Sequence, residues 1–308
     1  MFDSFIIVGT QVLTLFILIG IGFACGKLKL INQSGVKCIN DIVIYIVNPC
    51  LIISAFQRPF EITLLHNFLL ALAGAFVGHF ICLMLALLIF RKQEEGRRKV
   101  LRFASMFSNC GFMGVPLLSA LLGADGVFYG AAYLVVFNLL IWSYGQYTMA
   151  KGSEGFEVKK VILNPGVIAV VVGLLFFFTS TTLPQIIMIP VDYMAALNTP
   201  VPMLIIGYTI SKFSVRDLLG GLDELKVYFI RLIIGPLILL GILYVMGLRG
   251  VVLAAVIVCG SAPTAALTTM FAIKFDCDEE LSARIVSTST LLSIVTMTLI
   301  VGLTTYIG

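Results

Sequence analysis

The sequence has little charge and few polar stretches. Only 12% of its 308 residues are charged, about half the share in a soluble domain, and 60% are hydrophobic. Mean hydropathy is +1.09. Apolar blocks of about 20 residues, the length that crosses a bilayer, follow one another along the chain. These features exclude an ordinary soluble fold and predict an all-α polytopic membrane protein.

Several motifs that carry chemistry are also missing. No Gly-x4-Gly-Lys-Ser/Thr segment indicates ATP as an energy source. His-Glu-x-x-His and Gly-x-Ser-x-Gly are absent, and no Asp pair or Ser/His dyad lies within the apolar blocks. The seven cysteines lack metal-ligand spacing and predict free thiols. We expect that the protein is not an enzyme and that it binds no metal or cofactor. Whether a proton or Na⁺ is coupled to its activity is left open.

The start of the chain has no Lys or Arg before its first apolar block, so we expect that block to stay as a span rather than act as a signal peptide. We predict ten spans, at 5–25, 37–57, 66–90, 100–121, 126–150, 163–182, 191–211, 225–247, 250–273 and 284–306.

The cations are distributed unevenly over the loops between these spans. Eighteen of the 20 Lys and Arg residues, Arg231 among them, fall on one side, and only Arg58 and Arg249 on the other. The positive-inside rule makes the cation-rich side cytoplasmic and places both termini outside. The net charge of +4 therefore indicates topology in a cytoplasmic membrane rather than a nucleic-acid partner. No Lys or Arg is expected at mid-depth.

The two halves of the chain resemble each other. A linker at 151–162 separates five spans in 1–150 from five in 163–308, and an odd number gives the halves opposite orientations. "NPCLIISAF" in span 2 matches "VPMLIIGYT" in span 7. "NCGFMGVPLLSALLG" in span 4 matches "VCGSAPTAALTTMFA" in span 9, each with Cys-Gly and a later Pro. We predict an inverted repeat.

Spans 4 and 9 carry helix-breaking residues: Gly111, Gly114 and Pro116 in one, Gly260 and Pro263 in the other. Freed backbone groups are tolerated in a membrane only inside protein or along a wet cavity. Corresponding broken spans in inverted halves indicate a transporter's central site. We expect the breaks to cross. The alternative is a pair of proline kinks with small residues for close packing.

Such a crossing would turn helix N-termini toward a cavity, and their free N–H groups favour an anion. Polar side chains at the breaks could complete the site, although the Ser and Thr hydroxyls could instead bond to their own helices. The predicted substrate-binding residues are Asn48, Asn109, Gly111, Pro116, Ser261, Pro263 and Thr264.

Three further polar residues are candidates for coupling or support. Asp41 could bind a coupling ion, or be solvated or paired with Lys37. His79 could relay protons or simply pack, and Asn138 could support the crossing or bond to another helix. Asn48 also has an alternative role, because it could satisfy the kink at Pro49 instead of lining the substrate path.

Four segments in order, "NPCLIISAF", "SNCGFMGVPLL", "GADG" and "CGSAPTAA", resemble the auxin efflux carrier family, and most closely its bacterial members labelled malonate or malate permeases. The resemblance implies two inverted five-helix repeats with crossed helices 4 and 9, as in bile-acid carriers and sodium–proton antiporters. It also implies a scaffold of spans 1, 2, 6 and 7 and a moving transport domain of spans 3–5 and 8–10. Asn109, Pro116 and Pro263 fall where that family has its crossover residues.

The resemblance further implies small organic anions as substrates and a homodimer. Plant auxin carriers have a long central loop that ten residues replace here, which argues against assuming auxin. We therefore predict a secondary transporter of a dicarboxylate or auxin-like carboxylate that works by elevator-type alternating access. The alternative is a membrane ligand sensor with the same fold and no net transport.

Overall fold

The computed structural model describes residues 2–150, 162–212 and 220–307, so nearly all of the predicted linker at 151–162 lies outside it. The regular elements within these ranges are helices. In the first half they are α1 (Phe2–Lys27), α2 (Gln33–Ile42), η1 (Val43–Val47), α3 (Asn48–Ala55), α4 (Ile62–Ile89), α5 (Glu95–Met106), η2 (Cys110–Gly114), α6 (Val115–Leu140), η3 (Ile141–Gly145) and α7 (Gln146–Met149).

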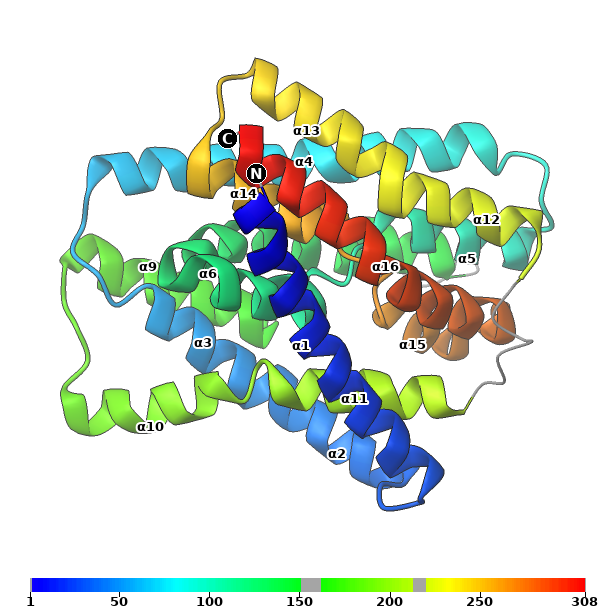
Figure 1. Ribbon diagram of the computed structural model, residues 1–308, viewed down its shortest axis with the longest axis horizontal. Coiled ribbons are helices and arrows are strands. Elements are labelled where there is room, and N and C mark those ends of the chain that lie inside the picture. Colours follow the sequence, from blue (N-terminus) through cyan, green and yellow to red (C-terminus); the bar gives the residue numbers. More distant parts are fainter. Residues whose placement is uncertain (1, 151–161, 213–219, 308) are drawn as a thin grey trace.

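The second half is also built from helices of different lengths (Figure 1). Its elements are α9 (Pro165–Thr179), α10 (Gln185–Ala196), α11 (Pro200–Ser211), α12 (Leu222–Phe229), η5 (Ile230–Ile234), α13 (Gly235–Val245), α14 (Gly250–Ser261), α15 (Leu267–Lys274) and α16 (Glu279–Ile307).

Among the described residues, six helical segments are long and apolar enough to cross a membrane, which confirms a multi-pass helical membrane protein. They are Gln33–Ala55, Ile62–Ile89, Cys110–Met149, Gln185–Ser211, Leu222–Val245 and Glu279–Thr304. Three shorter apolar helices are Leu13–Lys27, Pro165–Thr179 and Gly250–Ser261. The arrangement of ten spans as an inverted repeat goes beyond this finding and stays a prediction.

The 40-residue segment Cys110–Met149 folds back on itself at Gly123. Gly123 has φ +59° and ψ −145°, a conformation that favours glycine. A Cβ built on Gly114 or on Gly130 would lie within 4 Å of Cys259. In a straight helix these two glycines would be about 24 Å apart. The segment therefore forms a hairpin, at the place where the sequence analysis separates spans 4 and 5.

Three of the four described π-helical turns come directly before a proline. η1, η2 and η5 are each followed by an α-helix with Pro as its second residue, at Pro49, Pro116 and Pro236. Proline has no N–H and its ring clashes with the carbonyl four residues earlier. One wider turn in front of the proline relieves that clash without breaking the helix. These prolines therefore bend helices that continue through them.

The helices form two sets (Figure 1). In one set, α1 packs on α11, and α3 packs on α9 and α10. In the other, α6 packs on α4 and α14, while α16 packs on α14 and α15. The sets meet where α1 contacts α16 and α3 contacts α6.

Glycines allow α1 and α11 to cross at very short range. A Cβ on Gly207 of α11 would lie only 2.0 Å from the carbonyl oxygen of Ile19 in α1. In return, a Cβ on Gly22 of α1 would lie 2.3 Å from the carbonyl oxygen of Leu204. Such small-residue contacts are typical of helix pairs in membranes. They hold α1 and α11 backbone to backbone.

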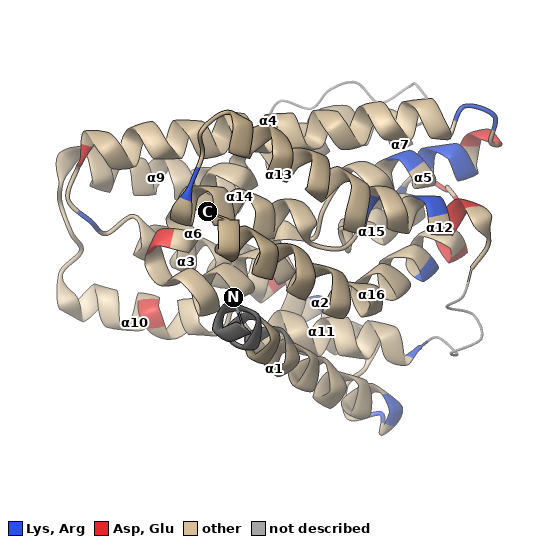
Figure 2. Cartoon of the chain, turned by 45° about the horizontal axis from the view of Figure 1, so that its top comes forward, with Lys and Arg blue, Asp and Glu red and all other residues tan. Residues whose placement is uncertain are grey.

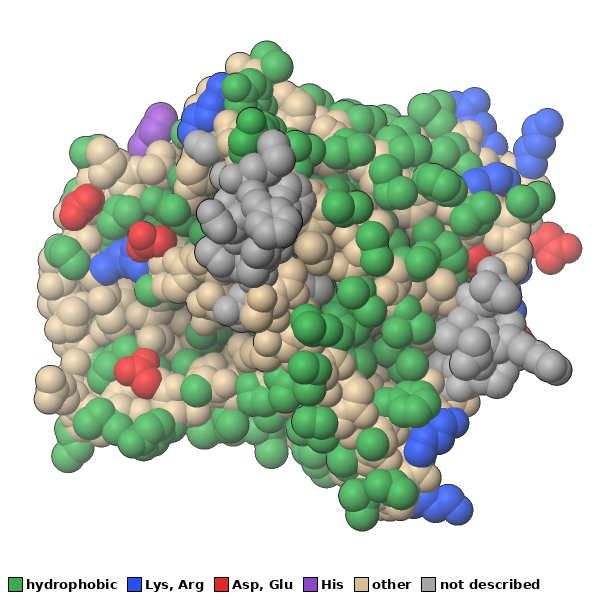
Figure 3. Space-filling model, in the orientation of Figure 1, with side chains coloured by type: hydrophobic (Ala, Val, Ile, Leu, Met, Phe, Trp, Pro, Cys, Tyr) green, Lys and Arg blue, Asp and Glu red, His purple; other side chains and the backbone are tan. Residues whose placement is uncertain are grey.

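Charge gathers at one end of the molecule (Figure 2). We call this the cation-rich end; α5, α12 and the end of α1 that carries Lys27 lie there, whereas Arg58 follows the far end of α3 and Arg249 follows the far end of α13. Between the ends, the face drawn in Figure 3 is largely apolar, and Phe80 within α4 is 61% exposed. A bilayer solvates such side chains, so the described surface fits a protein whose middle lies in lipid.

An ion-pair network lies at the cation-rich end. The Glu224 carboxylate of α12 is only 2% exposed and lies 3.2 Å from a guanidinium nitrogen of Arg97 and 3.6 Å from one of Arg284. Arg97 also pairs with Asp223 and Asp278. These contacts join α5, α12, α16 and the segment before α16.

Candidate functional site

Two helix breaks meet in the centre of the molecule. α5 ends at Met106 and the chain resumes as η2 at Cys110, while α14 ends at Ser261 and resumes as α15 at Leu267. The backbone N–H of Asn109 donates to the carbonyl of Pro263 at 2.6 Å, and that of Ala265 donates to the carbonyl of Phe107 at 2.9 Å. These bonds form an antiparallel bridge. The predicted crossing of the two breaks is present.

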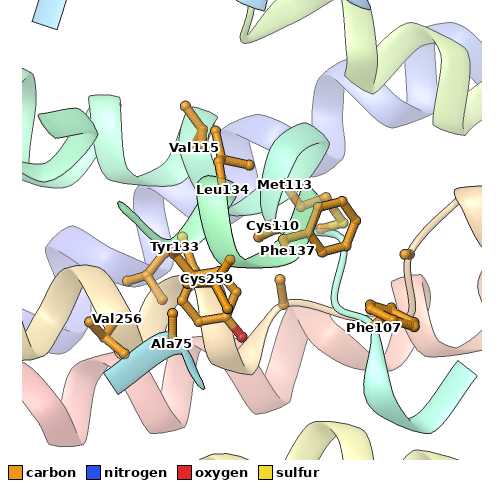
Figure 4. Close-up of a cluster of buried hydrophobic side chains, with 14 of the residues drawn as sticks. Ala75, Phe107, Cys110, Met113, Val115, Tyr133, Leu134, Phe137, Val256 and Cys259 are labelled. Atoms are coloured by element: carbon orange, nitrogen blue, oxygen red, sulfur yellow. The ribbon is translucent and has the colours of Figure 1, made fainter. Parts of the chain in front are cut away.

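The crossing is buried, and neighbouring helices bind the polar groups of Thr264. Thr264 donates through Oγ1 to the carbonyl of Ala104 at 3.1 Å, and its backbone N–H donates to the hydroxyl of Ser289 at 3.2 Å. Phe107 and Cys259 belong to the surrounding cluster of buried apolar side chains (Figure 4). This shell keeps water away from all but one side of the crossing.

The first break lies ahead of the residues that the sequence indicated. Phe107 and Asn109 have extended or irregular backbone, whereas Gly111, Gly114 and Pro116 lie in the continuous helix formed by η2 and α6. The π-turn at η2 accommodates Pro116, so that proline does not end the helix. In the second break the prediction holds for Pro263, while Gly260 is still within α14.

A buried arginine lies behind the crossing, which corrects the expectation of no cation at mid-depth. Arg231 of η5 is 2% exposed. Its guanidinium donates to the carbonyl of Met106 at 3.1 Å and to the carbonyl of Gly260, at the ends of α5 and α14 respectively. It also lies 3.5 Å from the sulfur of Cys82. Both broken helices therefore end on the same cation.

A cavity of about 540 Å³ lies on the other side of the crossing, and η1, α15 and the segment before α9 contribute to its lining. Aromatic and aliphatic side chains line most of it, and Asp41 and Lys274 are its two charged residues. The lining residues are Asn40, Asp41, Ile44, Tyr45, Asn48, Ile52, Asn109, Gly111, Phe112, Leu134, Phe137, Asn138, Trp142, Leu163, Asn164, Pro165, Gly166, Ala265, Ala266, Leu267, Met270, Phe271 and Lys274.

Both crossing segments present helix N-termini to this cavity. Gly111 and Phe112 belong to the first turn of η2, while Ala266 is the N-cap of α15 and Leu267 its first residue. The first N–H groups of a helix have no partner within it and carry partial positive charge. Asn109 adds a side-chain donor, because its Nδ2 is buried without a hydrogen-bond partner among the described residues. This arrangement can bind an anion at the crossing.

Five of the predicted residues line the cavity: Asn48, Asn109, Gly111, Asp41 and Asn138. Asn138 also donates to the carbonyl of Leu134 on its own helix. Asp41 and Lys37 both lie in the described chain, and they form no ion pair with each other. The structure thus brings these polar side chains into one space between the two helix sets.

The other predicted residues do not line it. Ser261 donates to the carbonyl of Val258 on its own helix, and Thr264 bonds to α5 as described. Pro263 contributes its carbonyl to the bridge. Pro116 is buried in α6. The hydroxyls therefore stabilise the crossing rather than face a ligand.

His79 lies away from the cavity. It is 1% exposed, its Nδ1 is 2.8 Å from the carbonyl of Ala75, and its ring packs near Phe107, Tyr133 and Phe137. These contacts describe a packed histidine beside the crossing. Among the described residues, no group of three His, Cys, Asp or Glu side chains forms a metal site.

Sequence reasoning missed three kinds of residue at this site. The positive-inside pattern counts Arg231 with the cytoplasmic cations, and the sequence analysis does not name Trp142 or Phe271, which line the cavity. Asn164 was also missed; it lines the cavity, and its Oδ1 accepts from the N–H of Gly166 at 2.9 Å as the N-cap of α9. The available signal was Asn before Pro165, which is typical of a helix start.

Comparison with known proteins relates the chain to membrane transporters. The sequence model of a family described as "Membrane transport protein" matches residues 7–301. An uncharacterized transporter of Methanothermobacter thermautotrophicus is 26% identical over 294 residues, which cover 94% of this chain and 95% of that protein. An uncharacterized transporter of Methanocaldococcus jannaschii is 22% identical over 299 residues, 94% of this chain and 96% of that protein. The chain therefore belongs to the membrane transport protein family, that of the auxin efflux carriers.

Proposed function

We propose that this membrane transporter carries a small organic anion across the cytoplasmic membrane as a secondary transporter. The observation that supports this most is the cavity at the crossing, where two helix N-termini and the unpartnered amide of Asn109 converge. A carboxylate there would accept hydrogen bonds from these donors.

The proposed mechanism is elevator-type alternating access. The set containing α4–α7 and α12–α16 would move, with the crossing, against the set containing α1–α3 and α9–α11. The exposed lining residues Asp41 and Lys274 support an opening toward the cation-rich end, which the proposal makes cytoplasmic. At the opposite end Arg58 and Asp125 form an ion pair with a 2.6 Å separation, between the segment after α3 and the hairpin of α6. That pair supports a closed outer side.

Asn109→Ala tests the site. Losing a hydrogen bond to a charged group costs about 1.5–3 kcal/mol, so we expect anion affinity to fall about tenfold or more. Uptake of labelled malonate, malate and indole-3-acetate into proteoliposomes measures this. Asn67→Ala serves as the control, because Asn67 lies on α4 and does not line the cavity.

Saturable uptake of one anion that Asn109→Ala loses and Asn67→Ala keeps would support the proposal. Uptake that both variants retain would place the site elsewhere. Binding of an anion to the folded wild type without any uptake would favour the ligand sensor instead.

A further inference from the structure

We propose that Arg231 cancels the negative helix ends behind the crossing, so that the cavity accepts an anion with a single negative charge. The inference rests on the proposed function and narrows its substrate class. It selects monocarboxylates over the dicarboxylates that the sequence alone leaves equally open.

The first step is that Arg231 keeps an unopposed charge. A guanidinium stays protonated in proteins. Within the described chain no carboxylate lies within ion-pair distance of Arg231, whereas Arg97 and Arg284 each pair with Glu224. The partners of Arg231 are carbonyls of Ser105, Met106 and Gly260 and one thiol.

The second step is the balance of charge at the crossing. A helix carries roughly half a positive charge at its N-terminus and half a negative charge at its C-terminus. The C-termini of α5 and α14 together amount to about one negative charge, which Arg231 offsets. The N-termini of η2 and α15 then leave about one positive charge on the cavity side. That amount matches one carboxylate.

The third step is that the rest of the cavity adds no net charge. Its two charged side chains, Asp41 and Lys274, have opposite sign and are both exposed. The buried amide of Asn109 independently indicates a ligand, since it lacks a partner among the described residues. Phe112, Phe137, Trp142 and Phe271 line the space around it. A second carboxylate placed against these aromatic side chains would be desolvated without a counter-charge.

Arg231 is near enough to matter for affinity. Its acceptor Met106 precedes Asn109 by three residues, which span at most about 11 Å. At that separation, and with the effective dielectric typical of proteins, one unit charge changes the affinity for an anion about tenfold. Arg231 is thus a positioning residue, which acts on the ligand through the helix ends that it holds.

The test compares anions of matched skeleton and different charge. Uptake into proteoliposomes is measured at neutral pH for phenylacetate against phenylmalonate, and for monomethyl malonate against malonate. The proteins are wild type, Arg231→Lys, Arg231→Gln and Arg249→Gln. Arg249 is a matched control because it also donates to backbone carbonyls, that of Tyr244 in the last turn of α13 and that of Leu248 after it, at the far end of α13 from η5.

We expect the wild type to take up the monovalent member of a pair at least tenfold faster. Arg231→Gln should lower uptake of the monovalent anion about tenfold and that of the divalent anion further, so that the ratio between them rises. A purely structural loss would lower both equally. Arg231→Lys should retain more uptake than Arg231→Gln, and Arg249→Gln should match the wild type.

Equal or faster uptake of the divalent anions by the wild type would overturn the inference, even where Arg231→Gln does not fold. So would an Arg231→Gln variant that is folded and indistinguishable from Arg249→Gln. A wild type that takes up neither pair but does transport malate would also refute it, since the proposed function would stand without the charge match. No uptake of any anion would instead remove the proposed function.

Discussion

Replacing Gly207 with valine is expected to abolish the folded protein. The first carbon of the new side chain would lie 2.0 Å from the carbonyl oxygen of Ile19 and 2.6 Å from the backbone nitrogen of Phe23. Overpacking a core costs about 1–3 kcal/mol when side chains can yield. Here the obstacle is the backbone of α1, which cannot yield without separating from α11, so the cost should exceed that range.

Size-exclusion chromatography in detergent, with a thermal melt, measures this. Gly20→Val is the matched control, because Gly20 is also in α1 and a Cβ there would meet nothing within 4 Å. The control should elute as the wild type does, while Gly207→Val should be aggregated or absent. A monodisperse Gly207→Val with the wild-type melting temperature would contradict the close crossing of α1 and α11.

Glu224→Gln is expected to lower the free energy of unfolding by about 3 kcal/mol. Removing one partner of a buried ion pair costs about 3–5 kcal/mol because the remaining charge loses its compensation. The value should be at the lower end, since the side chains of Arg97 and Arg284 are 32% and 24% exposed and water can reach them. Unfolding in a detergent titration measures the change.

The control for this variant is Glu280→Gln. Glu280 also lies within 4 Å of Arg284, at 3.8 Å, but its side chain is 83% exposed. An exposed pair contributes about 0–1 kcal/mol. Equal effects of the two substitutions would show that burial of Glu224 does not strengthen its pairs.

The sequence was most informative where a polar residue interrupts an apolar block. Asn109, Asn48 and Asn138 stand out in this way, and all three line the cavity. An amide side chain is costly to bury in a membrane without a use, so its position carries information. Hydroxyls carry less, because Ser261 and Thr264 could bond to backbone, and in the structure they do.

The position of the first break could not be taken from glycine and proline alone. Pro116 bends a helix that continues, because the π-turn of η2 removes the clash in front of it. The break at Phe107–Asn109 depends instead on Pro263 and Ala265, which supply its hydrogen bonds from the other half of the chain. A pairing between such distant residues has no local signal.

Arg231 shows the same limit for charge. Its residue type favours a loop or a cytoplasmic helix end. Burial of Arg231 is tolerated only because α5 and α14 both end at its guanidinium. Its partners Met106 and Gly260 each lie more than 25 residues from it in the sequence, one before it and one after it. The positive-inside rule counts each Lys and Arg separately and does not consider which backbone groups could bind it in the folded protein.

The bridge between Ser108 and Thr264 has a consequence for biosynthesis. At a ribosome speed of roughly 5–20 residues per second, the about 150 residues between them take on the order of ten to thirty seconds to emerge. During that interval the segment around Ser108 lacks the backbone partners that the segment around Thr264 later supplies. Backbone N–H and C=O groups without hydrogen bonds are costly in hydrocarbon. The nascent first half must therefore satisfy those groups in another way, either within the insertion machinery or nearer the membrane surface, until the segment around Thr264 has been synthesised.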